Sequence, residues 1–163
     1  MKAADLPRVG LEESIQRLEA MPAFLDAAIG AAPGDALVSR PGPDEFSLVE
    51  HACHLRDLER EGYLVRVRRV LTEECPLLEP FDGAAVASAR DYLREDARIA
   101  AREFAAARRE LAALLAALTA DDMRREAGFG DRRVCLGDLI AMMVEHDRGH
   151  REEIERLVVE LEE

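Results

Sequence analysis

The sequence contains no tryptophan, only three cysteines, and no hydrophobic run long enough to span a membrane. A membrane helix needs about 18 or more apolar residues in succession, and no window approaches that length. Cys53, Cys75 and Cys135 form no CxxC pair, so we expect neither a disulfide framework nor an oxidising environment. The first residues also lack the basic-then-apolar pattern of a signal peptide. We therefore expect a cytoplasmic protein without a membrane partner.

Basic residues are scarce as well, at 22 against 34 acidic residues, which gives a formal net charge of −12. Binding to nucleic acid requires a concentrated positive surface, and no basic segment here is free of interleaved acids. A nucleic-acid partner is therefore not expected. Lys2 is the only lysine, and this preference for arginine, together with abundant alanine, is typical of a bacterial protein from a GC-rich genome.

The chain does contain enough apolar material for a core. Hydrophobic residues make up 48% of the sequence and charged residues 34%, which is typical of a globular protein rather than a disordered one. A chain of 163 residues can bury a core without disulfide bonds. Proline and glycine gather at the joints between segments. We expect one domain that spans residues 1–163.

Segments in which apolar and polar residues alternate are missing, whereas apolar residues recur at three- and four-residue steps in four long stretches. These stretches predict helices at about residues 9–29, 48–74, 84–118 and 136–162, with no strand between them. Ser47 followed by Glu50 predicts a capping box at the start of the second helix. The sequence therefore predicts an all-α four-helix bundle, a fold that often holds metal sites between facing helices.

The four histidines stand in two clusters, on the second and fourth predicted helices. His146 and His150 are four residues apart, which places both imidazoles on one helix face, about 5–6 Å apart at Cβ. They interrupt an apolar stripe, where neutral imidazoles need hydrogen-bond partners that leucine and methionine cannot supply. A divalent metal ion would satisfy both rings, and hydrogen-bonded core histidines are the alternative.

A third ligand is expected from the second helix, which carries both His51 and His54. When that helix is projected at about 100° per residue, its apolar arc includes His51 and has His54 at its edge. Periodicity therefore slightly favours His51 as the residue that faces the fourth helix.

The segment FSLVEHACHLRDLE, from Phe46 to Glu59, resembles the second-helix motif of the DinB-like (damage-inducible) superfamily. That motif reads approximately Trp-Ser-x-x-Glu-x-x-x-His-Leu-x-Asp-x-Glu. The resemblance continues through residues 80–82 and residues 136–150, so it extends over nearly the whole chain. It implies a DinB-like four-helix bundle in which three histidines bind a divalent metal ion at one end. Carried over by position, the metal ligands are His54, His146 and His150.

This sequence departs from the family pattern in ways that bear on the site. Phe46 replaces the usual tryptophan, and Cys135 stands where serine or threonine would cap the fourth helix better. His51 occupies a position that is usually aliphatic, so it is a candidate fourth ligand, a group that supports a ligand, or a pocket residue. Carboxylates that could orient the ligating histidines lie nearby in the sequence: Glu50, Asp57, Glu145 and Asp147.

Three neutral imidazoles would leave a metal ion with its full positive charge and an open position. Zinc is the ion that we expect first, and nickel and iron also suit imidazole ligands. Zinc in such a site lowers the pKa of bound water to about 7, and a metal ion can also hold a thiolate. The resembled superfamily includes transferases of low-molecular-weight thiols and isomerases or hydrolases of thiol adducts. The implied partners are therefore a small-molecule thiol or an electrophile.

The leading hypothesis is a metal-dependent enzyme that activates a thiol, as an S-transferase, or water, as a hydrolase. One alternative is a non-catalytic metal-binding or stress-response bundle, and another is a helical interaction domain whose histidines bind nothing. Related bundles often pair through helix faces, so a homodimer is expected.

Other residues with chemical potential have plainer interpretations. Three arginines near the end of the second helix could bind an anionic substrate, but neighbouring glutamates favour surface ion pairs instead: Arg66, Arg68 and Arg69 with Glu59, Glu61 and Glu73. Cys53 lies beside His54 in sequence but about 100° away around the helix, so we expect a small buried hydrophobe rather than a ligand.

Overall fold

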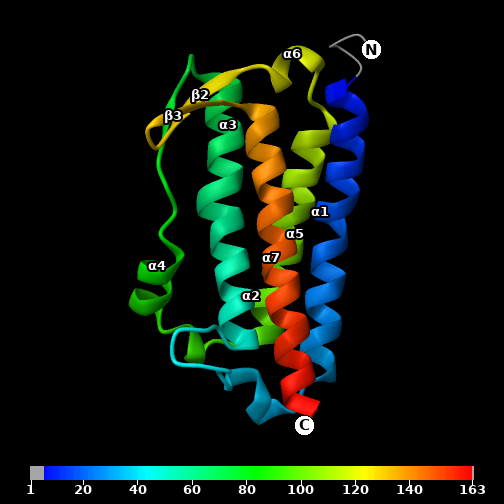
Figure 1. The fold of residues 1–163 in the computed structure, drawn as a ribbon, viewed down its shortest axis with the longest axis vertical. Helices are drawn as coiled ribbons and strands as arrows, with labels where there is room; N and C mark the ends of the chain where they lie inside the picture. The colour runs from blue at the N-terminus through cyan, green and yellow to red at the C-terminus, as the bar shows by residue number, and fades with distance from the viewer. Residues whose placement is uncertain (1–5, 163) are drawn as a thin grey trace.

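The computed structural model describes residues 6–162, and the side chains of residues 10–162, as a four-helix bundle (Figure 1). The four rods are α1 (Leu6–Ala31), a long second helix, α5 (Ala97–Ala116) and α7 (Leu136–Glu162). In Figure 1, α1 and α7 run in one direction, and the second helix and α5 run in the other. A long connection therefore crosses over between the two parallel rods. The predicted all-α four-helix bundle is confirmed.

The second helix begins where the sequence predicts and then changes its hydrogen-bonding pattern. Ser47 Oγ accepts from the backbone N–H of Glu50, and the Glu50 carboxylate accepts from the backbone N–H of Ser47, which completes the expected capping box. The rod consists of α2 (Leu48–Asp57), a π-helical segment η2 (Leu58–Tyr63) and α3 (Leu64–Thr72). Such wide turns rotate every later residue relative to an uninterrupted α-helix, and no pattern in the sequence indicates them.

The single helix predicted over residues 84–118 is wrong, because the chain breaks there. The structure has α4 (Gly83–Arg90), the 3₁₀ turn η3 (Tyr92–Arg94) and then α5. Asp91 adopts a left-handed conformation with φ 51° and ends α4, and the side chain of Asp96 caps α5. Helix-forming alanine and arginine dominate this stretch. Aspartate, however, tolerates the left-handed conformation that ends α4, and the Asp96 carboxylate accepts from the backbone N–H groups of Arg98 and Ile99 at the start of α5. In Figure 1, α4 lies outside the bundle, beside the second helix.

The expectation of no strand is also wrong. β1 (Leu77–Leu78) pairs in parallel with β2 (Glu126–Phe129), which pairs in antiparallel fashion with β3 (Arg132–Cys135) around a turn at Gly130. Strands of two to four residues are too short to show a period of two in the sequence. The remaining short elements are the 3₁₀ turn η1 (Gly34–Val38) and α6 (Ala120–Met123). Among the described helices, none has the length and apolarity that crossing a membrane requires.

The core consists of two apolar halves with an ionic layer between them. One half gathers around Leu111 and Leu136, and the other gathers around Phe104 and Ile154. Between the two halves, Arg108 of α5 donates hydrogen bonds to three different rods. Its acceptors are the carboxylate of Glu59 on the second helix (2.7 and 3.0 Å), that of Asp147 on α7 (2.5 and 3.1 Å), and the carbonyl of Leu18 on α1 (2.9 Å). This layer connects all four rods about halfway along their length.

Candidate metal centre

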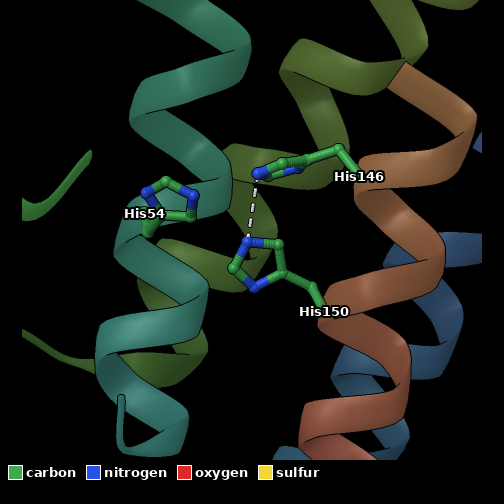
Figure 2. A group of neighbouring side chains, drawn as sticks. All are labelled: His54, His146 and His150. Atoms are coloured by element: carbon green, nitrogen blue, oxygen red, sulfur yellow. Dashed lines mark hydrogen bonds between the residues drawn. The ribbon is translucent and has the colours of Figure 1, made fainter. Parts of the chain in front are cut away.

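The histidines of the second helix and α7 face each other across the bundle. His54 extends from α2, and His146 and His150 extend from adjacent turns of α7 toward it (Figure 2). The Nε2 atoms of His146 and His150 are 3.2 Å apart. The ring centroid of His54 lies 5.5 Å from that of His146 and 4.8 Å from that of His150. One ring nitrogen from each histidine lies within 4.8 Å of the other two. The three residues expected to bind metal are thus brought together.

The cluster lies between the middle of the bundle and the end at which the second helix begins, because His54 is in the second turn of α2. His146 and His150 stand near the middle of α7, at the level of the Arg108 layer. Asp147, the residue after His146, takes part in that layer. The ionic layer therefore fixes the segment of α7 that presents the two imidazoles.

His51 lies directly behind His150. Its Nδ1 atom is 2.9 Å from Nδ1 of His150, and its Nε2 atom is 3.8 Å from a carboxylate oxygen of Glu153. If His150 donates its Nδ1–H to His51, the Nε2 lone pair of His150 stays free on the side that faces His146. Of the three roles predicted for His51, this contact favours the support of a ligand. Glu153, which the sequence did not single out, is the carboxylate at the end of this chain of contacts.

Burial keeps the four imidazoles neutral. Burial, together with smaller contributions from neighbouring imidazoles, lowers the pKa of His51 to about 4, of His54 to about 3 and of His150 to about 2. The pKa of His146 is lowered for the same reason, and the carboxylate of Asp147 opposes that effect. Neutral imidazole is the form that binds a metal ion, so these rings are ready to do so at pH 7.

The hydrogen bonds within the cluster leave ring nitrogens without partners. Nδ1 of His54 and Nδ1 of His146 are buried and have no hydrogen-bond partner among the described residues. The facing Nε2 atoms of His146 and His150 can share only one proton between them. Unpaired buried nitrogens are costly, and a divalent cation would use the lone pairs of the three ring nitrogens that lie within 4.8 Å of one another. The donor set therefore fits a divalent metal ion.

The four carboxylates proposed to orient the ligands do not hydrogen-bond to a histidine in the described part of the chain. Glu50 accepts from Arg40 and caps α2, and Glu145 pairs with Arg148 on the surface. The other two are occupied elsewhere: Asp57 accepts from Tyr92 Oη at 2.6 Å, and Asp147 accepts from Arg108. These carboxylates hold the helices, and the helices in turn hold the histidines.

Two clefts meet at the histidine cluster. The larger, of about 370 Å³, is here called the polar cleft, and its wall combines imidazole edges with charged side chains: His51, His54, His150, Glu45, Glu153 and Arg156. The smaller, of about 240 Å³, is here called the apolar cleft, and aromatic and aliphatic side chains surround it with His54, His146 and one arginine: Tyr63, Phe81, Phe129, Leu139, Met143 and Arg66. His54 lines both clefts, whereas His150 lines the polar cleft and His146 lines the apolar cleft.

The arginines of α3 divide between surface and interior. Arg69 pairs with Glu73 at 2.8 Å, as the sequence predicted, and Arg68 pairs with Glu110 rather than with a neighbour. Arg66, however, is buried in the apolar cleft, so the predicted surface ion pair is wrong there. Its spacing from buried Tyr63 and Val70, three and four residues away, was the available signal.

Two glutamates of the π-helical segment, which were expected to pair with the arginines of α3, have other partners. Glu59 is buried against Arg108, and Glu61 pairs with Arg90 of α4. Cys53 is buried in the core, as expected for a small hydrophobe. Its thiol has a pKa raised to about 12 by burial, which keeps it from acting as a ligand at neutral pH.

Gly83, the first residue of α4, supports His54 from outside the bundle. A Cβ atom at this position would lie 2.6 Å from Cε1 and 2.9 Å from Nδ1 of the His54 ring. The absence of a side chain therefore lets α4 approach the imidazole closely. No local pattern in the sequence indicates this contact.

Replacing Gly83 by alanine is expected to weaken metal binding, because the added methyl group must displace the His54 ring. A change in ligand orientation of this kind costs about 10–100-fold in metal affinity. Competition with a chromophoric chelator measures the change. The matched control is Gly149→Ala, beside His150, where an added Cβ meets nothing within 4 Å. It should leave affinity unchanged and stabilise α7 by up to about 1 kcal/mol. Equal affinities in both variants would show that α4 does not position His54.

Lowering the pH from 7 to 5 is expected to destabilise the metal-free protein. The histidines titrate near 6.5 in the unfolded chain, whereas burial holds the folded pKa at about 4 for His51 and about 3 for His54. The unfolded state therefore binds more protons than the folded state between pH 7 and pH 5. As the pH is lowered, the free energy of unfolding decreases by up to about 1.4 kcal/mol per pH unit for each buried histidine. The lowered pKa values of Glu50 and Asp57 keep those carboxylates charged throughout.

Urea unfolding at pH 7, 6 and 5 in the presence of a chelator measures this dependence. His51→Leu should reduce the slope, since one depressed histidine is removed. A free energy of unfolding that stays constant over this range would contradict the placement of the imidazoles in the interior.

Comparison with known proteins identifies relatives. The model of the DinB superfamily matches residues 17–154 of this chain. A search of curated proteins found no match. Among solved structures, the chain is similar to YfiT from Bacillus subtilis, described as a probable metal-dependent hydrolase with an unusual four-helix bundle topology. The two share 24% identity with a TM-score of 0.84, over 93% of this chain and 87% of YfiT. At this identity, the likeness to YfiT establishes the fold.

Proposed function

This chain belongs to the DinB superfamily, and we propose that it is a metal-dependent hydrolase whose divalent ion is held by His54, His146 and His150. One observation carries the proposal. Three neutral imidazoles from two helices converge where two clefts meet, and buried ring nitrogens lack partners. The description of YfiT as a probable metal-dependent hydrolase supports the same reaction class.

A divalent ion on three neutral ligands keeps its charge and acts as a Lewis acid that makes water a nucleophile near pH 7. The protein contributes the surroundings. His51 fixes the orientation of the His150 ring, and Gly83 allows α4 to cover His54. The rings of Phe46 and Phe81 lie 5.4 and 6.1 Å from that of His54, whose side chain is buried. Excluding water strengthens the electrostatic interactions in the site.

The same donor set would also suit a thiol transferase, in which a substrate sulfur is the nucleophile. Zinc is the first choice of ion, and nickel and iron remain alternatives to be compared directly. In the non-catalytic alternative, the ion serves only to stabilise the bundle.

Turnover by the purified protein tests the proposal. Protein loaded with zinc, nickel or iron is assayed with small aryl esters and amides, and in parallel with a thiol plus an electrophile. We expect hydrolysis that is lost on chelation and restored by metal. His146→Ala should abolish it, whereas Arg148→Ala, a surface residue of the same helix, should not. Metal-dependent thiol transfer without hydrolysis would replace the proposal by the transferase. Bound metal without any turnover would support the non-catalytic bundle.

A further inference from the structure

Arg66 is a buried cation that has no carboxylate partner among the described residues. Its side chain leaves α3 for the interior, and the residue is 9% exposed. Nη2 donates to the backbone carbonyl of Glu79 at 3.2 Å, and Nε is buried with no partner among the described residues. The guanidinium stands over the ring of Phe129, 4.9 Å from its centroid, and 6.0 Å from that of Tyr63.

The other two buried arginines in the described part of the chain have carboxylate partners. Arg56 pairs with Asp57 and Glu95, and Arg108 pairs with Glu59 and Asp147. A buried charge is normally retained only with such partners, because removing it from water is costly. The chain has 34 acidic residues, and none of those described forms an ion pair with Arg66. An unpaired guanidinium in an apolar wall indicates an anion that binds from outside the chain.

The cleft around Arg66 reaches the histidines. Its wall includes Arg66, His54 and His146, no acidic residue contributes to it, and the rest is apolar or aromatic. The ring of Tyr63 stands edge-on to that of His146, with centroids 6.2 Å apart. Arg66 is close enough to His146 for its charge to contribute to the lowered pKa of that imidazole. An anionic group at Arg66 and a reacting group at the histidines can therefore belong to one small molecule.

We propose that Arg66 binds the carboxylate of a small, otherwise apolar substrate or product acid in the apolar cleft. This inference rests on the proposed function for what happens at the histidines, but the binding itself does not require metal. One guanidinium with aromatic neighbours suits a single carboxylate, whereas a phosphate dianion would need further donors. The cleft volume of about 240 Å³ equals that of about eight water molecules, which limits the ligand to a small acid.

Binding of benzoate, with neutral benzamide as the isosteric control, tests the proposal. Calorimetric titration is performed with metal-free protein in chelator and with zinc-loaded protein. We expect benzoate to bind at least about tenfold more tightly than benzamide in both forms, as one charge-assisted contact would give. Arg66→Gln should abolish this preference. Arg68→Gln, an exposed position of the same helix, should retain it.

Thermal unfolding separates a ligand-binding arginine from a structural one. If Arg66 is kept for a ligand, removing an unpaired buried charge should leave the melting temperature of Arg66→Leu unchanged or raise it by about 2–4 °C. A structural arginine would lower the melting temperature when removed. Benzoate should raise the melting temperature of the natural protein and not that of Arg66→Leu.

Three results would overturn the inference. One is an undiminished preference for benzoate in Arg66→Gln, and another is a lowered melting temperature of Arg66→Leu. The third is benzoate binding that chelation abolishes, which would assign the anion to the metal ion. The failure of the two proposals can be told apart. Hydrolysis without the Arg66 effect removes only this inference, whereas benzoate binding without any metal-dependent turnover removes only the proposed function.

Discussion

Replacing His150 by alanine is expected to lower the affinity for a divalent metal ion by more than about 100-fold. His150 lies between His146 and His51, with ring nitrogens at 3.2 and 2.9 Å, so its loss removes a ligand and its support together. Even the loss of an outer partner of a ligand costs about 10–100-fold. Elemental analysis after dialysis, followed by competition titration, gives the stoichiometry and the affinity.

His51→Leu serves as the graded control for this prediction. It keeps the three expected ligands and removes only the contact behind His150, so its affinity should fall between that of the natural protein and that of His150→Ala. Circular dichroism confirms that both variants remain helical. Stoichiometric metal in dialysed His150→Ala would show that the ion is held elsewhere, and the assignment of all three ligands would then be wrong.

Replacing Arg108 by methionine is expected to destabilise the protein by about 3–5 kcal/mol. The change leaves the carboxylates of Glu59 and Asp147 buried against each other without a cation, and it removes a hydrogen bond to the Leu18 carbonyl. Urea unfolding in the presence of chelator measures the loss without any contribution from bound metal. Arg109→Met, at an exposed neighbouring position on α5, should change stability by less than about 0.5 kcal/mol.

A triple variant distinguishes the net contribution of the ion-pair network to stability from the destabilisation caused by leaving its carboxylates unpaired. Replacing Glu59 and Asp147 by leucine together with Arg108→Met removes all the charges, and it should recover most of the lost stability. A loss below about 1 kcal/mol in Arg108→Met alone would contradict the view that this arginine neutralises two buried carboxylates.

Local signals in the sequence predicted the ends of the helices well. The capping box of Ser47 and Glu50 fixed the start of the second helix, and α7 occupies the predicted residues 136–162. The break at Asp91 was missed because its left-handed backbone depends on contacts formed in the fold, among them the pairing of Arg90 with Asp57. Propensity alone favoured a continuous helix there, since alanine and arginine stabilise one.

The sequence predicted those parts of the candidate site that depend on the spacing of residues along a single helix. His146 and His150 had to share a face, whereas the choice between His51 and His54 needed the family resemblance. The structure groups His54 with His146 and His150, and it groups His51 with His150 and Glu153. Contacts between distant segments could not be read from the pattern. Gly83 approaches His54 across 29 positions of sequence, and the partners of Arg108 come from separate helices.

On the second helix, the π-helical segment η2 lies between the candidate ligand His54 and Arg66 of the apolar cleft. His54 precedes it, whereas Arg66 follows it, so a one-residue deletion within residues 58–63 would turn Arg66 by about 100° and leave His54 in place. The number of residues in η2 thus determines which side chains of α3 face the apolar cleft. Insertions and deletions here offer a route by which new ligand preferences could evolve, or be engineered, on an unaltered set of histidines.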